Sequence, residues 1–455
     1  MNQNKFKYPV YVILVTILLL FILSFFKTDF KINGIPLRKT DIFSDLRKKK
    51  RIERRAAETM AYATVDSTIR YGVLLPKKIL EKGIIQYSDS QENSGLLHFF
   101  KALTEVSNGK RKKIRIAYFG DSMIEGDMIS QELRKMLQKK FGGKGVGFVP
   151  VTSVSAPNRS SVQHTFSDNW KDASFQNSAW GAYPFGFSGH VFYTKTTGCW
   201  FSLKGVKEER LKDFTAVKIF YGKADSGQSM QVNEINVPLV LHKAYNIINV
   251  TLEKPQKEVM VNMGSNLNLA VYGASLESDS GITLDNYSFR GISGVELSEI
   301  PGSFFRAINE AYPYDLVILH YGPNLLFKPE LIDFSWFAKK MEKTFLHLKK
   351  NLPQTSFLVI GTADKSSFTD GIWQTAAGVE PLIETQNKLA KKHHCAFWNL
   401  YANMGGENSM VQWAEKKPIR AGKDYTHLNQ RGAYQVADML YKALLLNFND
   451  YEKKH

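Results

Sequence analysis

The pattern of apolar and polar residues predicts a strand, a tight turn and a helix in close succession. Residues 114–119 (IRIAYF) form a short apolar run typical of a buried strand. Residues 120–122 (GDS) follow at once, and glycine and aspartate favour turns. Residues 128–141 then carry apolar side chains at helical spacing. This order predicts that Ser122 is lifted clear of a sheet and faces a helix N-terminus, where positive potential favours developing negative charge.

Two later segments have the same strand-then-loop pattern. Residues 282–289 (ITLDNYSF) alternate like a strand and run into a glycine-containing loop with Gly294. Residues 315–320 (DLVILH) form a continuous apolar run, as expected of a buried parallel strand, and Asn324 follows. Open α/β sheets carry their sites at the carboxyl ends of the strands. A glycine N–H and an asparagine amide are therefore expected at the same edge as the serine.

The C-terminal part supplies a candidate base. His427 is the only one of the ten histidines with an aspartate, Asp424, three residues before it, and a helical pattern follows over residues 432–446. A hydrolytic serine needs a base, and the base needs a carboxylate that fixes its tautomer. Asp424 and His427 meet both needs if they reach Ser122.

The four blocks, in this order, resemble the GDSL/SGNH hydrolase family. The resemblance implies a flavodoxin-like α/β fold, a parallel sheet in a three-layer α/β/α arrangement. It implies Ser122, His427 and Asp424 as the catalytic triad, and the N–H of Ser122, the N–H of Gly294 and the side-chain amide of Asn324 as the oxyanion hole. The first block reads GDSM and the third GPNL, so the residue after Asn324 lacks the carboxylate found in many members.

The segment between the first two strand units, residues 156–280, is too long for a simple crossover. Its many short strand-like runs, separated by turn residues, predict an inserted β-sandwich. The hydrolase domain is then split into residues 91–155 and 281–455. Trp170, Trp180 and Trp200 belong to a dense aromatic stretch and are candidate sugar platforms of a carbohydrate-binding module, although such rings also form sandwich cores. The clearest runs are residues 190–194, 216–221, 246–252, 258–263 and 267–272.

The N-terminal part predicts a membrane anchor. Residues 8–26 contain no charge and number about 19, enough to cross a bilayer as a helix. Bulky residues follow where a signal peptidase needs small ones, so residues 1–27 are interpreted as an uncleaved transmembrane helix. Residues 28–90 are a basic linker or stalk, with a helical pattern over residues 54–71. Lysines flank both ends of the span, so charge alone does not orient it.

Composition and charge limit which binding partners and cofactors are expected. The formal charge of +17 indicates an anionic neighbourhood, but neither zinc-finger spacing nor an RNP-like motif occurs, so nucleic acid is not expected. The two cysteines, Cys199 and Cys395, are far apart and predict two buried thiols. Residues 393–395 (HHC) would point alternately to opposite faces of a strand. We expect no metal site and no cofactor.

An anchor, an SGNH core and an inserted β-module together resemble the bacterial peptidoglycan O-acetylesterases. The resemblance implies an SGNH/GDSL-type carbohydrate esterase (EC 3.1.1) that removes O-acetyl groups from a cell-wall or surface polysaccharide, with peptidoglycan favoured, through an acetyl-serine. It also implies a single-pass protein of the inner membrane whose catalytic domain faces the periplasm or cell exterior. An O-acetyltransferase that acts on the same glycan, served by a membrane acyl-transfer partner, is the first alternative. A non-catalytic glycan-binding or assembly protein that retains the fold is the second.

Overall fold

The computed structural model describes residues 83–87, 95–177, 183–241 and 243–455, together with positions 12, 15, 16, 30–32 and 35–37. The chain divides into two compact units, Met1–Leu74 and Leu75–His455. In the first unit, β1 (Phe30–Ile32) and β2 (Ile35–Leu37) pair antiparallel. Most of the expected membrane span, the stalk helix over residues 54–71 and Trp180 lie outside the described residues. Within the described part, no helix has both the length and the apolar character needed to cross a bilayer.

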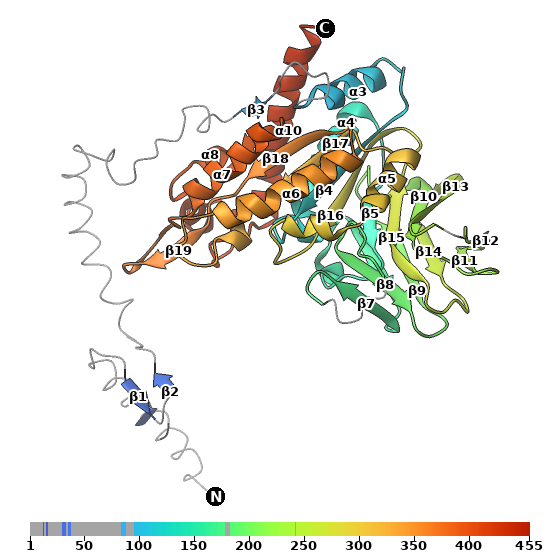
Figure 1. The fold of residues 1–455 in the computed structure, drawn as a ribbon, viewed down its shortest axis with the longest axis horizontal. Coiled ribbons are helices and arrows are strands. Elements are labelled where there is room, and N and C mark those ends of the chain that lie inside the picture. Colours follow the sequence, from blue (N-terminus) through green and yellow to red (C-terminus); the bar gives the residue numbers. More distant parts are fainter. Residues whose placement is uncertain are drawn as a thin grey trace, which may run out of the picture. The chain divides into compact units, whose positions relative to one another are not determined.

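The second unit contains a six-stranded sheet (Figure 1). Five neighbouring strands run parallel, and only β3, at one edge, is antiparallel to its neighbour β21. The mixed α/β class with a parallel sheet expected from the sequence is thereby confirmed. In spatial order the strands are β16 (Gly281–Ser288), β4 (Lys113–Gly120), β17 (Leu316–His320), β18 (Ser356–Gly361), β21 (Ala396–Asn399) and β3 (Ile84–Gln86).

Helices cover both faces of this sheet because successive side chains of a strand point in opposite directions. On β4, Ile116 and Tyr118 pack with one set of helices, and Ala117 and Phe119 with the other. The first set comprises α3 (Leu97–Ser107), α4 (Met128–Phe141) and α10 (Gln430–Glu452). The second comprises α5 (Gly302–Ala311), α6 (Ser335–Asn351) and α7 (Val379–Lys392).

Between α4 and β16 the chain forms two antiparallel sheets, which we call the antiparallel region. One has the order β13-β10-β15-β8-β7, with β5 also paired to β15, and the other has the order β12-β11-β14-β9-β6. Buried residues of both, such as Val217 and Val261, share one apolar core. The strands are β5 (Gly147–Pro150), β6 (Val162–Phe166), β7 (Trp170–Ser174), β8 (His190–Thr194), β9 (Trp200–Gly205), β10 (Phe214–Tyr221), β11 (Ser229–Val232), β12 (Ile235–Pro238), β13 (Asn246–Gln256), β14 (Glu258–Asn262) and β15 (Ala270–Glu277).

Two details of this region differ from the expectation. β5 precedes the boundary expected at residue 156, yet it pairs with β15. The strand expected over residues 267–272 begins at Ala270 and continues to Glu277, because its pairing with β10 extends over residues 271–277. Long-range pairing of this kind leaves little trace in a local sequence pattern. Both cysteines are buried free thiols, as expected.

Buried charges join the antiparallel region to the parallel sheet. Arg115 of β4 donates to Glu277 of β15 (2.9 Å) and to Asp285 of β16 (2.6 Å). Lys218 of β10 also reaches Glu277 (2.5 Å), as does Lys113 of β4. Because every one of these groups has an oppositely charged partner, the cost of burying them is offset.

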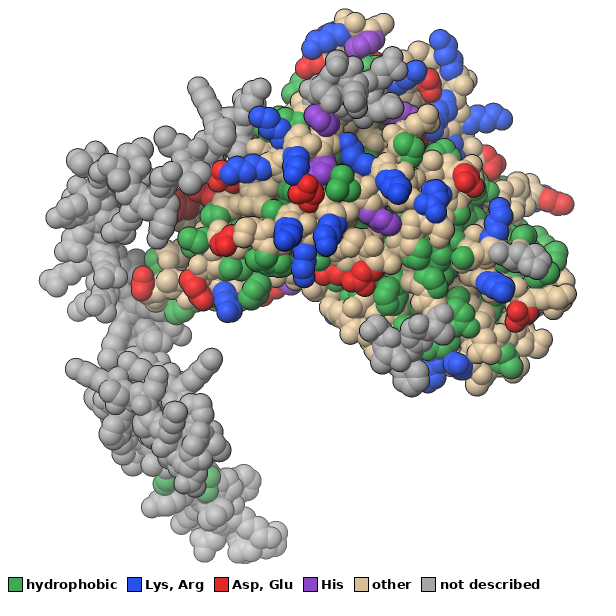
Figure 2. Space-filling model, in the orientation of Figure 1, with side chains coloured by type: hydrophobic (Ala, Val, Ile, Leu, Met, Phe, Trp, Pro, Cys, Tyr) green, Lys and Arg blue, Asp and Glu red, His purple; other side chains and the backbone are tan. Residues whose placement is uncertain are grey.

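Basic side chains are spread over the described surface. On the face shown in Figure 2, Lys and Arg are distributed across both the α/β part and the antiparallel region rather than gathered in one groove. Acidic side chains lie among them, so this face has no single basic groove.

Candidate active site

Ser122 lies in a turn that starts where β4 ends. A Cβ at Gly120 would lie 2.9 Å from the carbonyl oxygen of His320, so only glycine allows the chain to turn here. The helix α4 begins at residue 128, as the sequence pattern predicted, and not directly after the serine. A short 3-10 turn, η2 (Glu125–Asp127), intervenes because Asp127 adopts a left-handed conformation (φ 69°), and α4 begins only after it.

The structure brings the three expected triad residues together. The hydroxyl oxygen of Ser122 lies 2.8 Å from Nε2 of His427, and Nδ1 of His427 lies 2.6 Å from Oδ2 of Asp424. A carboxylate can only accept, so Nδ1 carries the proton and Nε2 is left to accept from the serine. This is the arrangement in which a serine becomes a nucleophile.

The turn between Asp424 and His427 fixes the carboxylate. Oδ1 of Asp424 accepts from the backbone N–H groups of Thr426 and His427, both at 3.1 Å. Tyr425 has a positive φ of 51°, which closes the turn. Burial alone would raise the pKa of the Asp424 carboxyl, but hydrogen bonds from the ring and backbone of His427 and from Thr426 hold this pKa below its usual value. The carboxylate therefore stays ionised near neutral pH.

Asp121, the residue before the nucleophile, is fully buried. Its Oδ1 accepts from the backbone N–H of Met123 at 2.9 Å, which helps to hold the serine turn. Burial raises the pKa of Asp121 to about 6, although hydrogen bonds from Met123 and Gly322 and the charge of His427 oppose the rise. No feature of the sequence indicated that the pKa of this carboxyl would be raised.

The two expected oxyanion loops meet each other. The side-chain amide of Asn324, in the 3-10 turn η5 (Pro323–Leu325), donates to the carbonyl of Ile292 at 2.9 Å. Gly294 has φ 92°, and a Cβ there would lie 2.6 Å from the ring of Tyr321, so glycine is required. One hydrogen of the Asn324 amide thus joins the loops, and the second remains available for another acceptor.

Glu296 was not singled out by the sequence pattern, yet it occupies one expected oxyanion donor. Its Oε2 accepts from the N–H of Gly294 at 3.0 Å and from the N–H of Ser293 at 3.2 Å. Gly294 precedes the 3-10 turn η4 (Val295–Glu299), so the contact resembles a capping box, in which an acidic side chain folds back on the first free N–H. A backbone amide has one hydrogen, so Gly294 can serve an oxyanion only after Glu296 releases it.

Lys365 is a second residue that sequence reasoning missed. It follows β18, and its Nζ donates to the carbonyls of Pro323 (3.0 Å) and Leu326 (2.9 Å), at the two ends of the turn that carries Asn324. Burial lowers the pKa of Lys365, and the charges of Asp121 and Asp424 oppose this. The lysine thus clamps the oxyanion turn and adds a positive charge near both carboxyls. Only the tertiary fold identifies it, since lysines are abundant throughout the chain.

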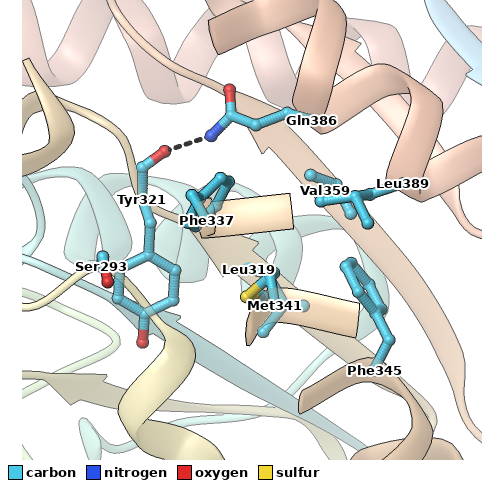
Figure 3. A pocket seen from close by; sticks show the side chains of 9 residues that line it. All are labelled: Ser293, Leu319, Tyr321, Phe337, Met341, Phe345, Val359, Gln386 and Leu389. Carbon is cyan, nitrogen blue, oxygen red and sulfur yellow. Dashed lines mark hydrogen bonds between the residues drawn. The ribbon is translucent and has the colours of Figure 1, made fainter. Parts of the chain in front are cut away.

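A small cavity lies behind the oxyanion loops (Figure 3). Ser293 and Tyr321 reach it from the loops, and mostly apolar side chains complete its wall. The amide of Gln386 closes one side by donating to the carbonyl of Tyr321 at 2.7 Å. Because none of the three triad residues lines it, this cavity is a packing space beside the site.

Among the expected sugar platforms, Trp170 is a core residue. Trp170 is only 8% exposed, and its Nε1 donates to the carbonyl of Trp200 at 3.0 Å. The expectation of an exposed ring at Trp170 is therefore wrong, because the indole packs against Phe201 in the core shared by the two antiparallel sheets. Trp200 is partly exposed and remains a candidate, while Trp180 lies outside the described residues.

Comparisons with known proteins agree with this architecture. No family model and no curated protein matches the sequence. A solved structure of a peptidoglycan O-acetylesterase matches with a TM-score of 0.68 and 22% sequence identity, over 81% of this chain and 99% of that one. A lipase/acylhydrolase from Enterococcus faecalis matches with a TM-score of only 0.26 and 13% identity, over 36% of this chain and 75% of that one. The resemblance to this esterase class that the motifs indicated is thus confirmed at the level of the fold.

Proposed function

We propose that this protein is a serine esterase that removes O-acetyl groups from a cell-wall or surface polysaccharide, with peptidoglycan as the favoured substrate. The observation that carries the proposal is the continuous hydrogen-bonded chain from Ser122 through His427 to Asp424. Ser122 and His427 are about 300 residues apart in the sequence, so the tertiary fold has to bring them together. The sequence of contacts, from serine to histidine to carboxylate, is the one that activates a serine nucleophile.

In the first half-reaction, Oγ of Ser122 attacks the acetyl carbonyl carbon while Nε2 of His427 takes the hydroxyl proton. The C–O bond to the sugar then breaks, His427 delivers that proton to the departing sugar oxygen, and the acetyl group remains on the serine. In the second half-reaction, Nε2 of His427 takes a proton from water, which attacks the acetyl-serine. The bond between the acetyl carbon and Oγ of Ser122 then breaks, His427 returns the proton to Oγ, and acetate leaves. The developing oxyanion is stabilised by the N–H of Ser122 and the second amide hydrogen of Asn324, joined by Gly294 once Glu296 has moved away.

Hydrolysis is favoured over acetyl transfer by the exposure of the triad. The side chains of His427 and Asp424 are 47% and 52% exposed, so bulk water reaches the acyl-enzyme freely. A transferase has to keep water from its acyl intermediate long enough for a sugar hydroxyl to attack. The complete triad also argues against the second alternative, a binding protein that has only retained the fold.

Different observations support the proposed substrate and the proposed cellular location. The likeness to a peptidoglycan O-acetylesterase over almost all of that chain supports an acetylated glycan. The uncharged span over residues 8–26 supports a single-pass anchor in the inner membrane, with the catalytic domain in the periplasm or cell exterior. An anchored esterase with a formal charge of +17 would be held close to an anionic wall polymer.

The proposal is tested by labelling with a fluorophosphonate, followed by mass spectrometry, and by measuring acetate release from O-acetylated peptidoglycan. We expect the label on Ser122, and Ser122→Ala should lower acetate release by at least about a thousandfold. Ser335→Ala is the matched control, because Ser335 is an exposed serine bonded to a carboxylate, Asp333, without a histidine. Acetate release that survives in Ser122→Ala contradicts the proposal, whereas loss in both variants indicates misfolding.

A further inference from the structure

A small aromatic hairpin is attached to the loop that carries the base. β19 (Ser366–Thr369) and β20 (Ile372–Thr375) pair antiparallel across an Asp370-Gly371 turn in which both residues have positive φ, as a two-residue hairpin requires. The N–H of Ser366 donates to the carbonyl of Tyr425 at 3.1 Å. Tyr425 lies between Asp424 and His427, so the hairpin and the base belong to one connected structure.

Two aromatic rings stand on one face of this hairpin. Phe368 and Trp373 are cross-strand partners, and their centroids are 5.5 Å apart in an edge-to-face arrangement. The indole of Trp373 stacks on the ring of Tyr425 with a centroid distance of 4.1 Å and an angle of 18°. Tyr425 is itself held, because its hydroxyl donates to Glu415 at 2.6 Å.

These rings remain accessible although the hairpin is rigidly held. Trp373 is 36% exposed and Phe368 is 51% exposed. At the base of β20, the Thr375 hydroxyl donates to Asp364 at 2.9 Å, and its backbone N–H donates to Asn408 at 3.1 Å. A ring that is fixed on one face and open elsewhere is preorganised for a ligand, because little conformational freedom is lost when the ligand binds.

From this geometry we infer that hairpin β19–β20 is a sugar-binding wall of the active site, with Trp373 as the platform for a pyranose ring of the substrate glycan and Phe368 as its edge. The inference rests on the proposed esterase function and deepens it. The apolar C–H face of a pyranose matches a flat aromatic ring, while its hydroxyl groups stay in water. A sugar seated on Trp373 would lie beside the loop that presents His427 to the departing sugar oxygen.

Other occupants fit these observations less well. The hairpin tip is Thr369, Asp370 and Gly371, so a charged and polar turn would enter a bilayer first, which opposes insertion into lipid. Each partner of a stable protein complex buries about 800 Å². Two aromatic side chains bury at most about 300–500 Å² even when fully covered, and these two are already partly covered.

The sequence analysis expected the aromatic contacts with sugar in the antiparallel region, whereas this inference places one on hairpin β19–β20. In Figure 1, β19 projects from the side of the α/β part opposite to strands β7 to β15. Trp170, the aromatic residue favoured there by the sequence, is part of the core. The exposed indole that touches the catalytic loop is Trp373.

The inference is tested in the Ser122→Ala background, where bound glycan is not hydrolysed, by affinity electrophoresis in gels that contain solubilised O-acetylated peptidoglycan strands. We expect Trp373→Ala to weaken binding at least tenfold, Phe368→Ala to weaken it several-fold, and Trp373→Phe to keep most of the affinity because the stack on Tyr425 survives. Trp336→Ala is the matched control: Trp336 is 41% exposed on α6, and this change should leave binding unaltered.

Each alternative result has a defined meaning. Unchanged affinity in both Trp373→Ala and Phe368→Ala overturns the inference, as does an equal loss in Trp336→Ala. Absence of any retardation of the Ser122→Ala protein, on strands that the wild type deacetylates, also overturns it. Loss of binding to anionic phospholipid vesicles, but not to glycan, would assign the hairpin to lipid instead. Because the stack on Tyr425 is made by Trp373, the Phe368 variant leaves that stack in place and separates glycan binding from damage to the loop of the base.

If the esterase assignment itself is wrong, acetate release persists in Ser122→Ala. If only the sugar-binding wall is wrong, that activity is lost while the hairpin variants bind glycan normally. The two failures are therefore distinguishable.

Discussion

The two ends of strand β4 carry charged or catalytic groups of opposite character. Near its amino end, Arg115 is 3% exposed and bonded to Glu277 and Asp285, which are fully buried. Just beyond its carboxyl end, Ser122 contacts His427, whose partner Asp424 is about half exposed. Acidic and basic groups thus stabilise the packing of strands at the amino end, whereas at the carboxyl end they form the candidate catalytic site.

Burial explains the difference. Where water is excluded, a charge can persist only with fixed partners, and such a group cannot exchange protons or meet a substrate. At the carboxyl edge, exposure lets His427 change its protonation state while Asp424 holds its orientation. The comparison predicts that changes at the Ser122 end affect turnover, whereas changes at the Arg115 end affect stability.

The largest expected effect is at the exposed end. Asp424→Asn should lower kcat by about 10⁴-fold, because the amide stabilises the wrong tautomer of His427. The free energy of unfolding, measured by urea titration, should change little. Asp438→Asn on α10, which removes a partly exposed carboxylate paired to Lys442, is the control and should leave kcat unchanged. A kcat of Asp424→Asn within tenfold of wild type would contradict the catalytic assignment.

At the buried end, Glu277→Gln should cost roughly 3–5 kcal/mol of unfolding free energy, because Arg115, Lys113 and Lys218 lose their shared counter-charge. Glu258→Gln provides the contrast. Its carboxylate pairs with Lys204 on the surface of the antiparallel region at 3.0 Å, and its loss should cost no more than about 1 kcal/mol. An equal loss of unfolding free energy in the two variants would show that burial does not make the Glu277 ion pairs more important for stability than the surface pair.

Acid should weaken the buried ion pairs progressively. Burial alone would raise the pKa of Glu277, but the charges of Arg115, Lys113 and Lys218 bring this pKa well below its usual value, and Arg134 and Arg159 do the same for the pKa of Asp127. A lowered folded-state pKa contributes stability above the unfolded pKa of about 4, and this stability is lost as the pH falls below it. Unfolding free energy measured from pH 7 to pH 3 should therefore drop below about pH 4.5. The drop should be smaller in Glu277→Gln, and an identical pH profile would argue against this role.

The smallest expected effect concerns Glu296. Glu296→Ala removes the carboxylate that holds the Gly294 N–H, so the amide becomes free for the oxyanion. We expect kcat to rise roughly fivefold, equivalent to about 1 kcal/mol, a typical net value for one hydrogen bond. Glu299→Ala, in the same 3-10 turn, is the control and should not raise kcat. A fall in kcat for Glu296→Ala would mean that the capping contact positions the loop for catalysis instead.

The sequence by itself predicted several elements of the α/β part, and it singled out the three residues that the structure brings together at the candidate site. Residues 128–141 form the predicted helix with its predicted bounds, and residues 190–194 form the predicted strand. Both succeed because apolar spacing reports which face of an element is buried. Ser122, Asp424 and His427 were singled out because the four blocks occur in the order that resembles the GDSL/SGNH hydrolases, since each block alone is also common in ordinary turns.

Only the tertiary structure decided which side chains surround these residues. Glu296 on the Gly294 amide, Lys365 on the Asn324 turn and Trp373 against Tyr425 are contacts that no local pattern encodes. Trp170 also shows that residue type does not fix exposure: a tryptophan suits a sugar platform, but this one packs in the core of the antiparallel region. Periodicity in sequence specifies which face of an element is apolar, but exposure and hydrogen-bond partners depend on neighbours brought from elsewhere in the chain.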